Sequence, residues 1–160
     1  MPNIYLLVLF VILFPLAFLV TWQILNMVYI EYIYLSLQKK YIADSLSSIE
    51  YLNFIKVLVI KKLWFDAIRF LELRPYMNKE CLSRCLNTLG FIYESITEYG
   101  LAEQYYFEAV NSKSCYLVAM QNLAKIYDLK KKNHLAIAIY KYILRCDPKN
   151  VIAKRRISSL

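Results

Sequence analysis

The sequence predicts an all-α protein in which one membrane-spanning helix precedes a right-handed solenoid of paired helices. Two observations carry this prediction. Met1 to Ile30 contain no charged side chain, whereas all 20 Lys and Arg residues lie at or after Lys39. The stretch LAEQYYFEAV, residues 101–110, is echoed by LAIAIYKYIL, residues 135–144, which starts 34 residues later. The first observation separates two regions with different solvents, and the second indicates a structural repeat.

The N-terminal region is long enough to cross a bilayer, because ~20 apolar residues in a helix span the ~30 Å hydrocarbon layer. We expect this span over residues 4–24, with Pro15 tolerated inside it. A cleaved signal would need a basic start, which Met1-Pro2-Asn3 lacks, so a retained anchor is favoured. Lys39 and Lys40 follow the span and place the C-terminal body on the positive-inside side of the membrane. Residues 1–37 are therefore interpreted as anchor and stalk, and residues 38–160 as the repeat domain.

Two repeats, residues 83–116 and 117–150, align without a gap. Seven positions of the first recur 34 residues later: Leu86, Leu89, Gly90, Tyr93, Ala102, Tyr106 and Ala109 correspond to Met120, Leu123, Ala124, Tyr127, Ala136, Tyr140 and Ile143. Apolar residues every three or four positions indicate two helices per repeat. The small residues among the seven would let the paired helices approach closely. Such a short pair buries its apolar face only when neighbours stack on it.

This pattern resembles the tetratricopeptide repeat, which combines the same length with a Leu, a small residue and a Tyr in the first helix and an Ala, an aromatic residue and an Ala in the second. The chain departs from it where Leu86 and Met120 replace the usual tryptophan and where Ile143 replaces a small residue. Neither change threatens the helix pair.

A degenerate first repeat and a capping helix complete the predicted domain. Residues 45–78 read as one helix to about Lys62 and a second from Trp64 to Leu73, ending before Pro75. Asp147 followed by Pro148 predicts a helix start, with a capping helix over residues 150–160.

No catalytic, metal or cofactor site is predicted. His134 is the only histidine and is placed in a turn, and two glycines in the whole chain leave no phosphate-binding loop. Since no Cys-x-x-Cys pair exists, we expect four free, buried or half-buried thiols in a reducing compartment, namely those of Cys81, Cys85, Cys115 and Cys146. An enzyme and a small-molecule substrate are therefore not expected.

Two basic clusters, Lys130 to Lys132 and Lys154 to Arg156, stand out in a chain of net charge +8. Cations at helix ends are usually solvated, and a membrane-tethered basic domain is also drawn to anionic headgroups. Without a nucleic-acid-reading motif, nucleic-acid binding is not expected.

The remaining functional candidate is a partner-binding groove, because the first helix of each pair lines the concave side of such a solenoid. Helical spacing from the core residues predicts ten groove residues: Arg84, Asn87, Phe91, Glu94, Ser95, Val118, Gln121, Lys125, Asp128 and Leu129. The alternative is that these are simply solvent-facing helix residues. The two-carboxylate clamp that some of these repeats use to bind chaperone tails is not found.

One membrane span followed by about three such repeats resembles the family catalogued as hypothetical chloroplast reading frame thirty-seven. The resemblance implies a non-enzymatic, chaperone-like factor for photosystem I assembly, anchored in the plastid thylakoid membrane with its C-terminal domain in the stroma. It would bind photosystem I subunits or other assembly factors. A protein-targeting receptor of an organelle and a scaffold of a bacterial membrane complex share this architecture and remain open.

Overall fold

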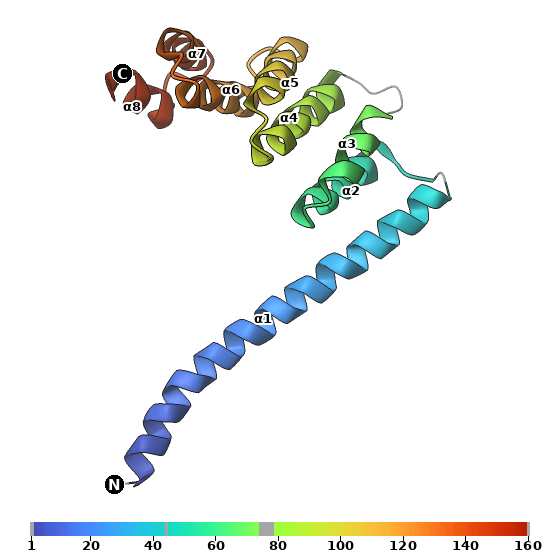
Figure 1. Cartoon of the computed structure of the whole chain (residues 1–160), viewed down its shortest axis with the longest axis vertical. Coiled ribbons are helices and arrows are strands. Elements are labelled where there is room, and N and C mark those ends of the chain that lie inside the picture. Colours follow the sequence, from blue (N-terminus) through green and yellow to red (C-terminus); the bar gives the residue numbers. More distant parts are fainter. Residues whose placement is uncertain (1, 44, 74–78, 160) are drawn as a thin grey trace. The chain divides into compact units, whose positions relative to one another are not determined.

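The computed structural model describes residues 2–43, 45–73 and 79–159, and within these ranges it contains eight α-helices and no strand (Figure 1). The predicted all-α fold class is thereby confirmed. The chain divides into two compact units, Met1–Val57 and Leu58–Leu160, and the division falls inside the second helix.

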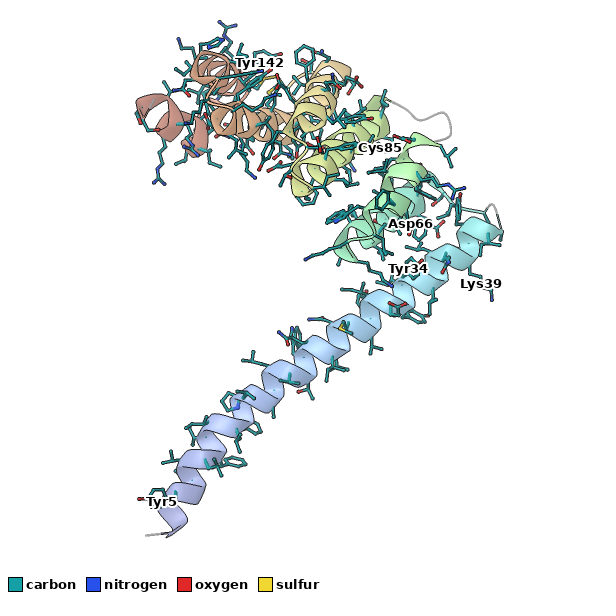
Figure 2. All side chains as sticks on the ribbon, viewed as in Figure 1. Tyr5, Tyr34, Lys39, Asp66, Cys85 and Tyr142 are labelled. Carbon is teal, nitrogen blue, oxygen red and sulfur yellow. A yellow bond between two sulfur atoms is a disulfide. The ribbon has the colours of Figure 1, made fainter. Side chains whose placement is uncertain are left out.

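The first unit is dominated by α1 (Pro2–Ile42), a single helix of 41 residues that contains Pro15. At ~1.5 Å per residue it is ~60 Å long, about twice the thickness of the hydrocarbon layer. Side chains project on all sides of its apolar part (Figure 2). Its segment Leu7–Ile42 is long and apolar enough to cross a membrane, and none of its most apolar part is buried. The predicted boundary at residue 37 lies inside this helix, which continues without a break to Ile42.

The C-terminal end of α1 packs on α2 (Ser48–Ile60) through aromatic rings. The ring centroids of Tyr34 and Tyr41 each lie 6.0 Å from that of Phe54. Leu37, which lies between the two tyrosines in the sequence of α1, is buried. This contact gives the end of α1 an apolar partner within its own unit.

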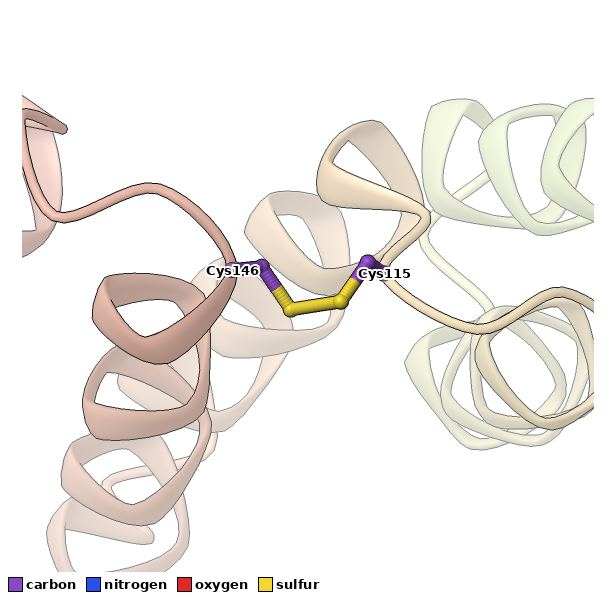
Figure 3. The surroundings of a disulfide bond; sticks show 2 residues. All are labelled: Cys115 and Cys146. Atoms are coloured by element: carbon purple, nitrogen blue, oxygen red, sulfur yellow. A yellow bond between two sulfur atoms is a disulfide. The ribbon is translucent and has the colours of Figure 1, made fainter.

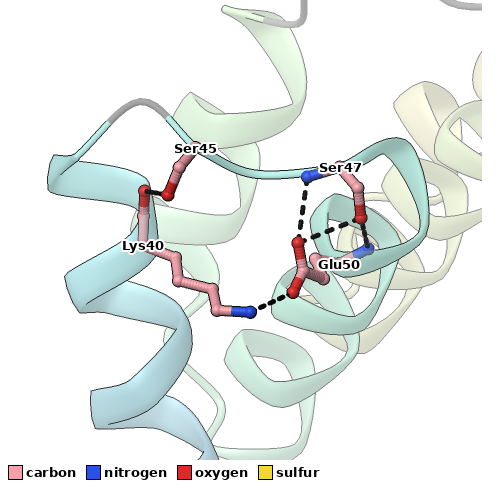
Figure 4. A network of polar contacts seen from close by, with 4 residues as sticks. All are labelled: Lys40, Ser45, Ser47 and Glu50. Carbon is pink, nitrogen blue, oxygen red and sulfur yellow. Dashed lines mark hydrogen bonds and ion pairs between the residues drawn. The ribbon is translucent and has the colours of Figure 1, made fainter.

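A polar network closes the connection between α1 and α2 (Figure 4). The Glu50 carboxylate accepts hydrogen bonds from the backbone N–H and the hydroxyl of Ser47, both at 3.0 Å, while the Glu50 N–H donates to the Ser47 hydroxyl at 3.3 Å. These reciprocal bonds form a capping box at the start of α2. Lys40 of α1 donates to the other carboxylate oxygen of Glu50. The sequence Ser-x-x-Glu at residues 47–50 is the signal for this cap.

We expect the Glu50 contact to be lost only in strong acid. The hydrogen bond from Lys40, followed by those from Ser47, lowers the pKa of Glu50 from 4.5 to about 2. A folded-state pKa below the unfolded value means that the contact contributes fully above the unfolded pKa and is lost as the pH falls towards 2. A carboxyl-carbon NMR titration of the full chain should give this low pKa, and Lys40→Gln should move it back towards 4.5. A Glu50 titration near 4.5 in the unsubstituted chain would contradict the network.

The second unit is a stack of helices in chain order: α3 (Trp64–Glu72), α4 (Lys79–Ser95), α5 (Tyr99–Ser112), α6 (Leu117–Leu129), α7 (Asn133–Cys146) and α8 (Val151–Ser159). Each of α4 to α7 contacts the next helix, and α3 contacts α4. The α6–α7 pair lies within the predicted second repeat, and α8 lies within the predicted capping segment. In the first repeat α5 lies within the predicted range, whereas α4 begins at Lys79, before the predicted start at residue 83. The predicted end of the degenerate repeat, residues 74–78, lies outside the described residues.

Three turns in the second unit share one backbone geometry. Lys62, Thr97 and Lys131 have positive φ angles of 56°, 66° and 55°. At Thr97 the N–H donates to the Glu94 carbonyl, and the next N–H donates to the Tyr93 carbonyl, at 3.0 and 2.9 Å. The same two bonds recur at the other turns, from residues 62 and 63 and from residues 131 and 132. This is the Schellman arrangement that ends a helix with a left-handed residue. The turn between α2 and α3 is therefore built like those of the two clear repeats.

The core of the second unit follows the repeated positions. Ala102, Tyr106, Ala136, Tyr140 and Ile143 are all buried, at 3% exposure or less. They come from α5 and α7, and they join Met120, Leu123 and Ala124 of α6 in one hydrophobic cluster. Small residues at the predicted helix contacts therefore lie in the core.

The start of α8 differs from the prediction in one detail. Asn150 caps this helix, because its side-chain oxygen accepts a hydrogen bond from the Ala153 N–H at 3.1 Å. Asp147, the predicted cap, instead follows α7 as its C-terminal cap residue. Its carboxylate accepts from the Lys149 N–H and from the Asn150 side chain and so orders the connection between the two helices.

Candidate partner-binding surface

One tyrosine–carboxylate hydrogen bond occurs in each clear repeat, at equivalent positions. The Tyr106 hydroxyl donates to Glu94 at 2.8 Å, and the Tyr140 hydroxyl donates to Asp128 at 2.9 Å. Burial, and then the carboxylate bond, raises the pKa of Tyr106 far above its usual value and that of Tyr140 to about 12. Both phenols therefore stay protonated at neutral pH and act as hydrogen-bond donors. These bonds join the two helices of each repeat.

Glu94 and Asp128, both predicted as groove residues, therefore accept hydrogen bonds from side chains within the fold. Their side chains are only 13% and 14% exposed. The second oxygen of Glu94 forms an ion pair with Lys125 of α6, and Asp128 lies 3.8 Å from the Arg156 Nε atom of α8. Sequence spacing placed these carboxylates on the correct helices and missed their buried tyrosine partners.

A second polar bridge connects α4 to α6. The side-chain amide of Asn122 donates to the side-chain oxygen of Asn87 at 3.0 Å. Asn87 was among the predicted groove residues, whereas Asn122 was not, because it lies one position beyond the repeat equivalent of Asn87. With the Lys125–Glu94 pair, this bond makes α4 and α6 one continuous surface, which we name the α4–α6 face.

The structure brings all ten predicted groove residues onto these two helices in matching order, but their environments differ. Phe91, Val118 and Leu129 are 44%, 50% and 51% exposed and supply apolar contact area. Arg84, Ser95 and Lys125 are also exposed, and Gln121 is half-buried. The Ser95 hydroxyl donates to the carbonyl of Phe91 at 2.8 Å within α4. The α4–α6 face thus offers apolar side chains to a partner, while much of its charge is neutralised internally.

Sequence reasoning missed a recess on α5 and the end of α6. It is lined by Glu98, Gly100, Leu101, Glu103, Gln104, Phe107, Tyr127 and Lys130. Phe107 is 51% exposed there, and its spacing from Leu101 and Gln104 on one side of α5 was the available signal. Burial alone would raise the pKa of Glu103, but hydrogen bonds from Lys130 and Lys132 outweigh it and lower that pKa. Two of the three cations in the first basic cluster are therefore paired with Glu103.

The prediction of four free thiols is wrong for two of them. Cys115 and Cys146 form a disulfide, with Cα atoms 5.7 Å apart (Figure 3). Cys115 precedes α6 and Cys146 ends α7, so the antiparallel pair brings these two ends together across 31 residues of sequence. Cys81 and Cys85 are buried thiols on α4, as predicted.

The described residues show no other constellation with evident chemistry. Within them, no group of three or more His, Cys, Asp or Glu side chains could hold a metal ion. His134 is exposed. It lies in the first turn of α7 and not in the connection before this helix, where the sequence analysis placed it.

Comparison with solved structures confirms the solenoid fold. The crystal structure of MamA, a tetratricopeptide-like solenoid, matches with a TM-score of 0.66 over 77% of this chain and 71% of that one, at 22% identity. A second MamA structure matches with a TM-score of 0.64. At this identity the likeness shows the fold alone.

Sequence comparison identifies relatives of similar length. No protein-family model matches the chain. It is 34% identical over 125 residues to the uncharacterized protein ycf37 of Cyanophora paradoxa, covering 76% of this chain and 73% of that protein. It is 30% identical over 169 residues to the ycf37 protein of Pyropia yezoensis, covering 98% and 92%. In agreement with the resemblance seen in the anchor and the repeats, the chain belongs to the ycf37 family.

Proposed function

We propose that this protein is a non-enzymatic, membrane-anchored adaptor that binds protein partners through the α4–α6 face during photosystem I assembly at the thylakoid membrane. The observation that carries the binding role is the exposure of Phe91, Val118 and Leu129 on one continuous two-helix surface. Exposed apolar groups flanked by satisfied polar pairs are typical of a surface that a partner covers. The photosystem assignment rests on the family resemblance and on the plastid name of the relatives.

The anchor gives this adaptor its mechanism. Helix α1 would confine the repeat domain to the membrane surface, where its concentration relative to membrane-bound partners is high, so that weak contacts suffice. Lys39 and Lys40 at the end of the span favour a stromal repeat domain. The Cys115–Cys146 disulfide is a countervailing feature, because disulfides persist mainly in oxidising compartments. Protease access to the repeat domain in intact thylakoids would establish its side.

The first test is an affinity purification of the tagged full chain from gently solubilised membranes, followed by mass spectrometry. Enrichment of photosystem I subunits over equally abundant photosystem II subunits supports the proposal. Recovery of translocation components would favour a targeting receptor, and recovery of unrelated envelope proteins would favour a general membrane scaffold. Photosystem accumulation that is unaffected by deletion of residues 1–37 would contradict the tethering mechanism.

We expect the double substitution Phe91→Ala and Val118→Ala to reduce partner capture by about tenfold or more, because truncating the few anchor residues at the centre of an interface costs more than about 1 kcal/mol each. Both side chains are at least 44% exposed, so the fold should be retained. Phe107→Ala on α5 is the matched control, because it removes an aromatic ring of similar exposure, 51% against 44% for Phe91, from another surface. If the double variant captures the partner normally and Phe107→Ala does not, the binding site is the recess on α5.

A further inference from the structure

The positively charged residues of the chain are distributed unevenly along the sequence. Residues 130–160 contain nine Lys and Arg residues and a single acidic residue, Asp147, which gives this segment a formal charge of +8. The preceding 129 residues contain 11 basic and 11 acidic residues and are neutral as a whole. The positive charge of the protein is therefore concentrated at the α7–α8 end of the solenoid.

Most of these cations are not neutralised within the fold. Lys130 and Lys132 pair with Glu103, and Arg156 lies near Asp128. The structure shows no ion pair to another described residue for the remaining six, which are Lys131, Lys141, Arg145, Lys149, Lys154 and Arg155. All six are exposed. Unpaired, solvated cations in such number create a local field that attracts anionic surfaces.

Helix α8 adds exposed apolar groups to this basic region. Its inner side is formed by buried Ala153 and half-buried Ile157, which pack on the core cluster. Val151 and Ile152 point away from the core and are 74% and 56% exposed. They line a recess on α8 together with Arg155, Arg156 and Ser159. The outward surface of α8 therefore combines cations with aliphatic side chains.

We propose that α8 and the unpaired cations around it dock on the anionic headgroups of the membrane that holds α1. Lys and Arg side chains near a negatively charged leaflet are attracted to it, and aliphatic side chains beside them can enter the headgroup boundary. This inference rests on the anchoring part of the proposed function. An acidic protein segment would meet the same charges, but α1 already places the chain at a membrane, so the lipid surface is the partner that the chain itself brings within reach. Docking would hold the repeat domain to the bilayer at a second point.

The test uses the full chain reconstituted into nanodiscs of phosphatidylcholine alone or of phosphatidylcholine with phosphatidylglycerol. Hydrogen exchange read by mass spectrometry should show α8 amides exchanging about tenfold more slowly in the anionic discs, with the difference removed by high salt. Equal exchange in the two kinds of disc would overturn the proposal. Slower exchange caused by added polyglutamate in neutral discs, without any effect of phosphatidylglycerol, would overturn it in favour of an acidic protein partner.

Matched charge variants sharpen this test. Lys154→Gln with Arg155→Gln should abolish the slowing, because both cations are exposed and form no ion pair with another described residue. Lys56→Gln with Lys62→Gln removes the same charge from exposed positions outside the basic segment and should leave the slowing intact. Loss in both variants, or in neither, would refute docking through α8. A chain that stays in the discs without α8 protection refutes docking alone, whereas a chain that does not enter the discs refutes the anchor as well.

Discussion

Reducing the Cys115–Cys146 disulfide should lower the free energy of unfolding of the repeat domain by about 3–4 kcal/mol. The bond closes a loop between residues 31 apart, and a crosslink over a loop of this length restricts the unfolded chain by about that amount. The disulfide connects the start of α6 to the end of α7, so its reduction should destabilise mainly that helix pair. Thermal unfolding of the full chain in detergent, followed by far-ultraviolet circular dichroism with and without a dithiol reductant, measures the effect.

Two controls separate the crosslink from other effects of the reductant. The double variant Cys115→Ser and Cys146→Ser should melt like the reduced parent and should not respond to reductant. Alkylation of the unfolded, unreduced parent should modify Cys81 and Cys85 alone, and prior reduction should expose all four thiols. Alkylation of four cysteines before reduction, or equal melting with and without reductant, would contradict the disulfide.

Substituting Gly90→Val should destabilise the α4–α5 pair by about 3 kcal/mol, at the upper end of the usual cost of overpacking a core. A Cβ atom at residue 90 would lie 2.6, 2.7 and 2.9 Å from three ring atoms of Tyr106. Tyr106 is fully buried and hydrogen-bonded to Glu94, so its ring has little freedom to move aside. The change should lower the urea concentration at the midpoint of unfolding of the full chain.

Gly100→Val is the matched control for this substitution. Gly100 lies in the first turn of α5, where an added Cβ would meet nothing within 4 Å. Its effect should stay within about 1 kcal/mol, as expected at an exposed position. Equal destabilisation by the two substitutions would show that helix propensity, and not the contact with Tyr106, determines the result. Gly90→Ala should be milder, because Ala124 occupies the equivalent position of the next repeat near Tyr140.

The repeat domain was accessible from the sequence because the residues that hold it together are local and periodic. The positions of Leu89, Ala102 and Tyr106 recur 34 residues later in the second repeat. Each helix packs mainly on its neighbours in the sequence, so the pattern specified both the pairing and the stacking of helices. The long uncharged start likewise indicated α1. The same spacing placed the ten predicted groove residues on α4 and α6.

Features that depend on side-chain reach were not accessible in this way. The spacing of Glu94 and Asp128 indicated an outward face, but only the packed helices show that buried tyrosines of the partner helix reach these carboxylates. Cys115 and Cys146 meet because the turn before α6 and the end of α7 lie at the same end of an antiparallel pair. Neither cysteine stands in a short spacing motif. Lys130 and Lys132 were expected to be solvated, whereas the structure pairs both with Glu103.

The three equivalent turns at Lys62, Thr97 and Lys131 have a consequence for how proteins of this kind change length. Each turn ends one helix and starts the next with the same pair of backbone hydrogen bonds, and none of the three uses glycine. The connectors are therefore interchangeable parts defined by main-chain geometry. Duplication or loss of one 34-residue segment joins compatible ends, so such a chain can gain or lose whole units in evolution while its remaining contacts are kept.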